Sequence, residues 1–164
     1  MNSPSIVDSH VHLWHPAQLR YAWLDGLPAL LNKHLLEADV RIITGFIEPH
    51  FFAGFSGGPK GIMPGLAGLE TVMSNHGEKN IGDPRATFGV TEGNPIWEEM
   101  RDIALRIGPS FLLNVALNED REMTGVFAGD LVMAHRAGTQ FVRESAMQRV
   151  EQPLDHGRRY KDEA

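Results

Sequence analysis

The chain has 164 residues, of which 42% are hydrophobic and none is cysteine. This length fits one modest core, and the lack of thiols excludes disulfides and thiolate metal ligands. A net charge of −6 argues against nucleic-acid binding, which needs a clustered basic surface. No apolar run reaches the about 18 residues of a membrane span, and no signal peptide is visible. We therefore expect a cytoplasmic protein with neither nucleic-acid nor membrane partners.

A histidine pair is the first chemical feature along the chain. An apolar stretch ends in His10 and His12, which would face the same side of a strand and could share one metal ion. The run IVDSHVHLWHPAQLRYAWLDGLPALLNKHL resembles the start of a lactonase-like amidohydrolase, in which this pair binds a metal at the mouth of a (β/α)₈ barrel. Such a barrel takes about 250 residues. We therefore assign residues 1–36 to an amidohydrolase-like segment whose metal site lacks its other ligands.

The next part of the chain is predicted to alternate helix and strand around a glycine-rich loop. Leu27–Glu37 is expected to be helical, with His34 on the surface. Val40–Phe46 is apolar and β-branched, which is typical of a buried strand. The following residues to Pro64 are rich in turn formers, and Pro64–Asn75 has helical spacing of its apolar side chains. In a strand, loop and helix of this kind, backbone N–H groups and a helix N-terminus can hold an anion.

Two histidines in this stretch, His50 and His76, bracket a single lysine, Lys60. The glycines between them are Gly54, Gly57, Gly58, Gly61, Gly65 and Gly68. Glycine at this density is costly for folding, which indicates turns through positive φ or close approach of the backbone to a bound group. The loop is not a Walker A motif, because Gly61 follows the lysine where a hydroxyl would bind magnesium. A cofactor or anion site and a surface loop with unrelated histidines are both compatible with this pattern.

The second half of the chain is expected to supply the scaffold. A helix is predicted over 94–107, because an asparagine cap is followed by proline at the first helical position. Phe111–Leu117 and Met123–Phe127 are predicted to form a hairpin, with the first of them in the same sheet as the earlier strand. A last helix is expected over 130–148, on which His135 would be structural or lie at the surface.

The run PHFFAGFSGGPKGIMPGLAGLETV and the histidine after it resemble the nickel-dependent lactate racemase family. The segments GNPIWEEMRDIA, FLLNVALNED and GVFAGDLVMAHRAG resemble that family as well, so that the resemblance covers residues 37–150. It implies an α/β fold, a partial lactate-racemase-like domain in which a strand, glycine loop and helix are joined to a mixed sheet. The Asp-Asp-x-Thr-Arg-Pro motif and the partner acid/base histidine of full-length members have no counterpart here. Residues 151–164 form a charged tail that is expected to be disordered.

The resemblance also implies a cofactor and a reaction. Members of the family bind a nickel-pincer nucleotide, to which Lys60 would be linked through a thioamide while His76 binds the nickel. Gly57 and Gly58 would lie at the cofactor, and His50 would be an acid/base group. The implied activity is that of an isomerase which inverts a small 2-hydroxy acid by hydride transfer and depends on cofactor maturation proteins. An incomplete racemase segment, a metal-dependent amidohydrolase or lactonase fragment and a non-catalytic nucleotide-binding domain are the alternatives.

Overall fold

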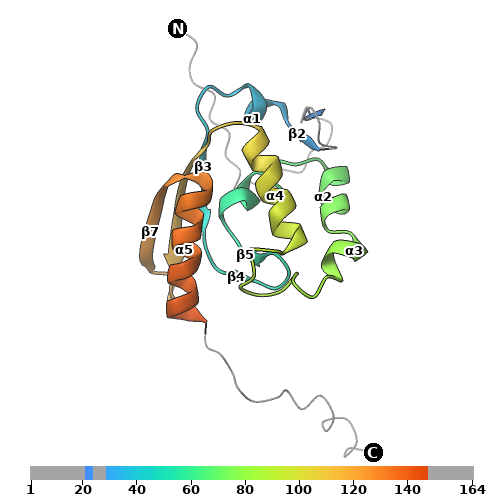
Figure 1. Cartoon of the computed structure of the whole chain (residues 1–164). Helices are drawn as coiled ribbons and strands as arrows, with labels where there is room; N and C mark the ends of the chain where they lie inside the picture. The colour runs from blue at the N-terminus through green and yellow to red at the C-terminus, as the bar shows by residue number, and fades with distance from the viewer. Residues whose placement is uncertain (1–20, 24–28, 148–164) are drawn as a thin grey trace, which may run out of the picture.

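The computed structural model describes residues 21–23 and 29–147, which form a three-stranded mixed sheet with helices packed on it (Figure 1). The central strand is β6 (Phe111–Leu117). It runs parallel to β3 (Ile42–Phe46) and antiparallel to β7 (Met123–Asp130). The predicted α/β fold with a mixed sheet is therefore confirmed, as is the hairpin of the two later strands. The strand predicted over Val40–Phe46 begins two residues later, at Ile42, where its pairing with Phe111 starts.

The sheet buries one face because its side chains alternate. Leu112, Asn114 and Ala116 of β6 are buried, whereas Phe111 and Leu113 on the other face are exposed. The buried face packs against α5 (Leu131–Ala146), which begins where Asp130 accepts hydrogen bonds from the amides of the first turn. The helix presents its buried residues to the sheet at helical spacing; they are Leu131, Ala134, His135, Gly138, Thr139 and Val142.

A long crossover joins the parallel strands β3 and β6, as parallel pairing requires, and it contains the glycine-rich loop. Its short strands β4 (Pro49–His50) and β5 (Gly54–Phe55) pair with each other. The 3₁₀ turn η1 (Gly58–Gly61) follows and contacts β3, α4 and α5. Two short helices come next, α2 (Leu69–Asn75) and α3 (Glu78–Ile81). The order of strand, glycine loop and helix agrees with the sequence prediction.

The helix predicted from Pro64 begins only at Leu69. Between η1 and α2 the chain makes successive turns, in which the amides of Gly65, Leu66 and Ala67 donate to carbonyls three to five residues earlier. The amide of Gly68 instead donates to Leu30 O at 2.8 Å, which ties this stretch to the N-terminal segment. Hydrogen bonds to a distant segment, rather than helix propensity, therefore set the start of α2.

The prediction of one helix over Leu27–Glu37 is wrong. Leu30–Asn32 forms strand β2, antiparallel to β1 (Tyr21–Trp23), and only Lys33–Glu37 is helical, as α1. The amide of Leu30 donates to Thr71 Oγ1 at 2.7 Å, and Asn32 caps α1 by accepting from the amide of His34. These partners satisfy the backbone in an extended form until the cap is reached. His34 is exposed, as expected.

Helix α4 (Pro95–Arg106) lies at the centre of the main core. The side chain of Asn94 caps it by accepting from the amides of Ile96 and Trp97 at 3.0 and 3.3 Å, which confirms the predicted helix start. Its buried stripe consists of Ile96, Trp97, Met100, Ile103 and Ala104, with Ile107 just beyond the helix. The contacts of α4 with η1, α2 and α3 place its first turn beside the glycine-rich loop.

Candidate functional site

The structure brings His50, Lys60 and His76 into one neighbourhood, with the ring of Phe52 between the two histidines. The centroid of Phe52 lies 4.6 Å from that of His50 and 4.9 Å from that of His76, and it meets both rings edge to face. The ammonium group of Lys60 is close enough to both imidazoles to lower their pKa values. Three residues from a strand, a 3₁₀ turn and a helix end therefore share one space.

His50 ends β4, and its ring is held by the turn that follows. Its Nδ1 atom accepts hydrogen bonds from the amides of Ala53 at 3.2 Å and of Phe52 at 3.5 Å. The ring of Phe51 stacks on it at a centroid distance of 4.8 Å. Burial, with smaller contributions from Lys60 and His76, lowers the pKa of His50 to about 4, so the ring is neutral at pH 7.

Lys60 lies on η1 and is partly buried. Burial lowers its pKa, because the ammonium form loses hydration, and the carboxylate of Glu48 opposes this shift. A lowered pKa raises the fraction of neutral amine, which is the nucleophilic form of lysine. The neutral amine of Lys60 is therefore easier to form than that of a fully hydrated lysine.

Gly57 and Gly58 have positive φ angles of 74° and 55°, and their missing side chains leave room for neighbours within the protein. A Cβ atom on Gly57 would lie 2.5 Å from Asn114 Oδ1, and one on Gly58 would lie 2.5 Å from the ring of His135. The family resemblance implies that these glycines lie at the cofactor, and this stays a prediction. The structure gives them a packing role, because they let η1 approach β6 and α5 closely.

His76 directly follows α2, and its amide donates to Val72 O at 2.8 Å. Burial, and then Lys60, lowers its pKa. Its Nδ1 atom is buried and has no hydrogen-bond partner among the described residues. Imidazole nitrogen is a ligand type that suits nickel.

Three asparagines that are completely buried, Asn75, Asn94 and Asn114, anchor the backbone beside these residues. Asn94 Nδ2 donates to Phe52 O at 2.9 Å, close to His50. Asn75, next to His76, donates to Ile96 O at 3.2 Å and to a carboxylate oxygen of Glu99 at 2.7 Å. The remaining one, Asn114, accepts from the amide of Gly58 at 2.8 Å, two residues before Lys60. Buried amides of this kind are costly unless paired, so each one fixes its loop firmly.

Of these three asparagines, only Asn94 could be recognised from the sequence, and only as a helix cap. A signal for Asn114 was present, since it interrupts the apolar stretch FLLNVAL at a position that faces inward. For Asn75 no comparable signal exists, because a polar residue near the end of a helix is common on exposed surfaces. Its partners come from a helix about 20 residues further along the chain.

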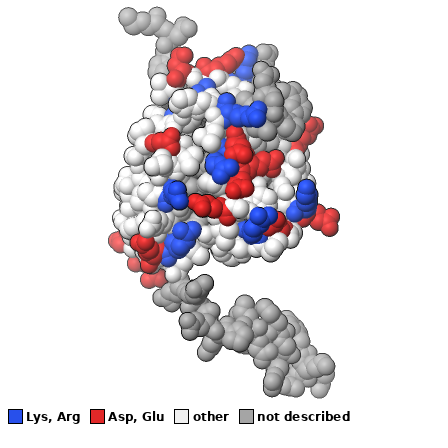
Figure 2. All heavy atoms as spheres, viewed as in Figure 1, with Lys and Arg blue, Asp and Glu red and all other residues white. Residues whose placement is uncertain are grey.

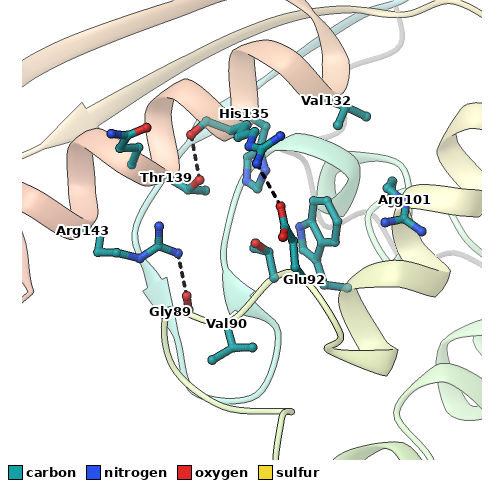
Figure 3. A pocket seen from close by; sticks show the side chains of 12 residues that line it. Gly89, Val90, Glu92, Arg101, Val132, His135, Thr139 and Arg143 are labelled. Carbon is teal, nitrogen blue, oxygen red and sulfur yellow. Dashed lines mark hydrogen bonds and ion pairs between the residues drawn. The ribbon is translucent and has the colours of Figure 1, made fainter.

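A cavity of about 580 Å³ lies apart from this neighbourhood, between the loop that contains Gly89, helix α4 and helix α5 (Figure 3). His135, expected to be structural or at the surface, is buried there: its Nε2 lies 2.9 Å from Ser56 O, and its ring stacks near Trp97. The three arginines of its lining are engaged within the chain. Arg136 pairs with Glu92, Arg143 donates to Gly89 O, and Arg101 pairs with Asp102.

The described residues contain no group of three or more histidine, aspartate or glutamate side chains that could hold a metal ion. His10 and His12 lie outside the described residues, as does the tail 151–164. In the face shown in Figure 2, basic and acidic side chains are interspersed. Within residues 21–23 and 29–147, no helix is long and apolar enough to cross a membrane.

Comparison with known proteins finds lactate racemases that are similar to this chain. The model of the lactate racemase N-terminal domain matches residues 23–89. A lactate racemase of Lactiplantibacillus plantarum is 44% identical over 119 residues, and one of Thermoanaerobacterium thermosaccharolyticum is 44% identical over 116 residues. Residues 23–89 are thus similar to the lactate racemase N-terminal domain, and most of the chain is similar to part of these two lactate racemases. The predicted resemblance over the glycine-rich loop and its flanks is therefore confirmed.

Solved structures agree with the lactate racemase assignment. The lactate racemase apoprotein of T. thermosaccharolyticum matches 84% of this chain with a TM-score of 0.73 and 39% identity, and a Thermotoga maritima protein matches 78% with a TM-score of 0.62 and 25% identity. The chain spans only 28% and 27% of the two curated lactate racemases, which it matches over 73% and 71% of its own length. The family match begins at Trp23, within the segment that was assigned to an amidohydrolase-like start.

Proposed function

We propose that this chain carries the cofactor-binding segment of a lactate racemase-type isomerase, which inverts a small 2-hydroxy acid. The observation that supports this most directly is the convergence of His50, Lys60 and His76 around Phe52. An anchor, a metal ligand and a group that contacts substrate are what such chemistry requires, and they come from separate parts of the backbone.

The residues fit a nickel-pincer nucleotide. Lys60 has a pKa lowered by burial, which favours the neutral amine needed for a covalent link. His76 offers an imidazole whose Nδ1 lacks a partner among the described residues. When bound, the cofactor would supply the nickel and the ring that accepts hydride from the α-carbon of the substrate. The protein would then hold that cofactor through Lys60 and His76.

His50 is the residue that we assign to the substrate oxygen. Its ring is fixed on the Nδ1 side by backbone amides, and it lies across Phe52 from His76. All three residues are partly buried, which reduces their hydration and strengthens the electrostatic interactions among them.

The proposal also covers the domain organisation of the chain and the part of the substrate site that lies outside the match. We assign residues 23–150, rather than 37–150, to the racemase-like domain, because the family match begins at Trp23 and because Leu30 and Asn32 bond to Thr71 and Leu66. The amidohydrolase-like segment is then limited to the residues before Trp23, and residues 151–164 are the charged tail. The relatives contain more than twice as much sequence outside the match as within it, and we propose that a counterpart of that part completes the substrate site. Cofactor maturation proteins and a cytoplasmic location complete the proposal.

Intact mass spectrometry of the chain produced together with cofactor maturation proteins tests this function. We expect a mass adduct and bound nickel in the wild-type chain. The adduct should be lost in Lys60→Ala and kept in the matched control Lys79→Ala, whereas His76→Ala should keep the adduct but lose nickel. Absence of the adduct from the wild-type chain, or an unchanged adduct in Lys60→Ala, would refute the proposal.

A further inference from the structure

One peptide group, between Phe52 and Ala53, connects the buried Asn94 with His50. Its carbonyl oxygen accepts a hydrogen bond of 2.9 Å from Asn94 Nδ2. Its N–H donates to His50 Nδ1 at 3.2 Å. Because a peptide group is planar and rigid, fixing its oxygen also fixes the direction of its N–H. Asn94 itself is immobilised, since its Oδ1 caps α4 by accepting from the amides of Ile96 and Trp97.

This contact determines where His50 carries its proton. An imidazole nitrogen that accepts a hydrogen bond has no hydrogen of its own, so the neutral ring must be protonated at the other nitrogen. The amide of Phe52 also points at Nδ1, at 3.5 Å. A hydrogen on Nδ1 would point at the hydrogen of one or both of these N–H groups, and the two hydrogens would repel each other. The geometry thus favours the tautomer with hydrogen on Nε2.

We propose that Asn94 is a positioning residue that acts through the Phe52–Ala53 peptide to hold His50 as the Nε2–H tautomer, so that His50 meets the substrate as a hydrogen-bond donor. The part of this inference that concerns substrate rests on the proposed function. It assigns His50 a different role from the acid/base role implied by the family resemblance. In this role neutral Nε2–H donates a hydrogen bond to the substrate oxygen, so the proton that the substrate hydroxyl loses with the hydride would go to a base supplied by the rest of the site.

The surrounding rings keep the imidazole in this orientation. Phe51 stacks on its face, with an interplanar angle of 13°, and Phe52 meets it at 78°. Turning the ring by 180° would place a carbon where Nδ1 now lies and would leave the amide of Ala53 without its acceptor. The loss of that buried hydrogen bond opposes the flip. A neutral histidine that donates from a fixed nitrogen can polarise a carbonyl and stabilise negative charge on its oxygen.

Nitrogen-15 NMR of the apo chain measures the tautomer directly, without cofactor or substrate. In a long-range proton–nitrogen correlation spectrum, we expect His50 to show an unprotonated Nδ1 and a protonated Nε2 at neutral pH. The resonance is assigned by its disappearance in His50→Gln. The wild-type spectrum alone decides the tautomer: a protonated Nδ1, or a rapidly averaged pair of nitrogens, would overturn the inference.

Two substitutions test the role of Asn94. Asn94→Ser keeps a good helix cap but removes the donor to Phe52 O, and we expect the His50 nitrogens to move toward averaged tautomers. Asn32→Ser is the matched control: Asn32 is also a buried cap, but it accepts from His34 on α1, and the His50 signals should not change. A folded Asn94→Ser chain with unchanged His50 signals would show that Asn94 does not position the ring. Because no adduct at Lys60 is needed, these outcomes are independent of the test of the proposed function.

Discussion

The Oδ1 atom of Asn114 accepts a hydrogen bond of 2.8 Å from the amide of Gly58, although the two residues are 56 positions apart. Asn114 lies at the middle of β6, and Gly58 opens the turn that carries Lys60. The contact joins the sheet to the candidate site in one step. It also explains a polar residue on the buried face of a strand, because Asn114 provides an acceptor that no apolar side chain could replace.

We expect Asn114→Ala to destabilise the chain by about 1–3 kcal/mol, the cost of leaving the buried amide of Gly58 without an acceptor. Urea unfolding followed by circular dichroism measures this change. Gln140→Ala is a suitable control, since Gln140 is exposed on α5 and bonds only to the exposed Glu144, and it should change stability by less than about 0.5 kcal/mol. Equal stabilities of the two variants would contradict the prediction.

Two glycines with positive φ, Gly57 at 74° and Gly93 at 79°, differ in what an alanine would meet. The backbone of Gly57, with ψ of −168°, also lies in a region open essentially only to glycine. Only at Gly57 would the new Cβ also collide with neighbours, lying 2.5 Å from Asn114 Oδ1 and 2.9 Å from Phe46 O. Gly57→Ala should therefore cost clearly more stability than Gly93→Ala. Similar unfolding midpoints would show that η1 can move away from β6.

Local signals were sufficient to predict the long elements of the fold. Helix α4 was predictable because a capping asparagine and a proline precede an apolar stripe, and these features act within one turn of each other. Strand β6 was predictable from its apolar run. In contrast, β2 depends on hydrogen bonds from Leu30 to Thr71 and from Asn32 to Leu66, partners that no local pattern indicates.

The candidate site also contains residues that could be predicted from local sequence and residues that could not. The reactive residue types and their spacing drew attention to His50, Lys60 and His76, which the structure does bring together. The anchors Asn75 and Asn114 could not be predicted with the same ease, because the burial of a polar side chain depends on partners far away in the sequence. Reactive side chains in a loop are thus easier to recognise from the sequence than the buried hydrogen bonds that position the loop.

Acid should destabilise the chain through His135. Burial lowers the pKa of His135 from 6.5 to about 4, so the unfolded chain takes up a proton at a higher pH than the folded one. Stability from this residue is complete above about pH 6.5 and decreases as the pH falls to 4, by up to about 3 kcal/mol. We expect His135→Gln to reduce the steepness of this loss in urea unfolding series between pH 7 and pH 4.5. The exposed control His34→Gln should retain it, and an identical slope in all three chains would contradict the assignment.

Glu48 should control the reactivity of Lys60. Its carboxylate stabilises the ammonium form and so opposes the lowering of the Lys60 pKa by burial. Glu48→Gln removes that stabilisation, which should lower the pKa further and raise the fraction of neutral amine at pH 7 to 8. Acylation of the apo chain by an amine-directed reagent, followed by peptide mass spectrometry, should then label Lys60 several-fold faster than in the wild-type chain. Lys79 provides the internal control, and its labelling rate should not change. An unchanged or slower rate at Lys60 would show that Glu48 does not act on this amine, whereas faster labelling would identify it as the residue that limits nucleophilicity at the candidate site.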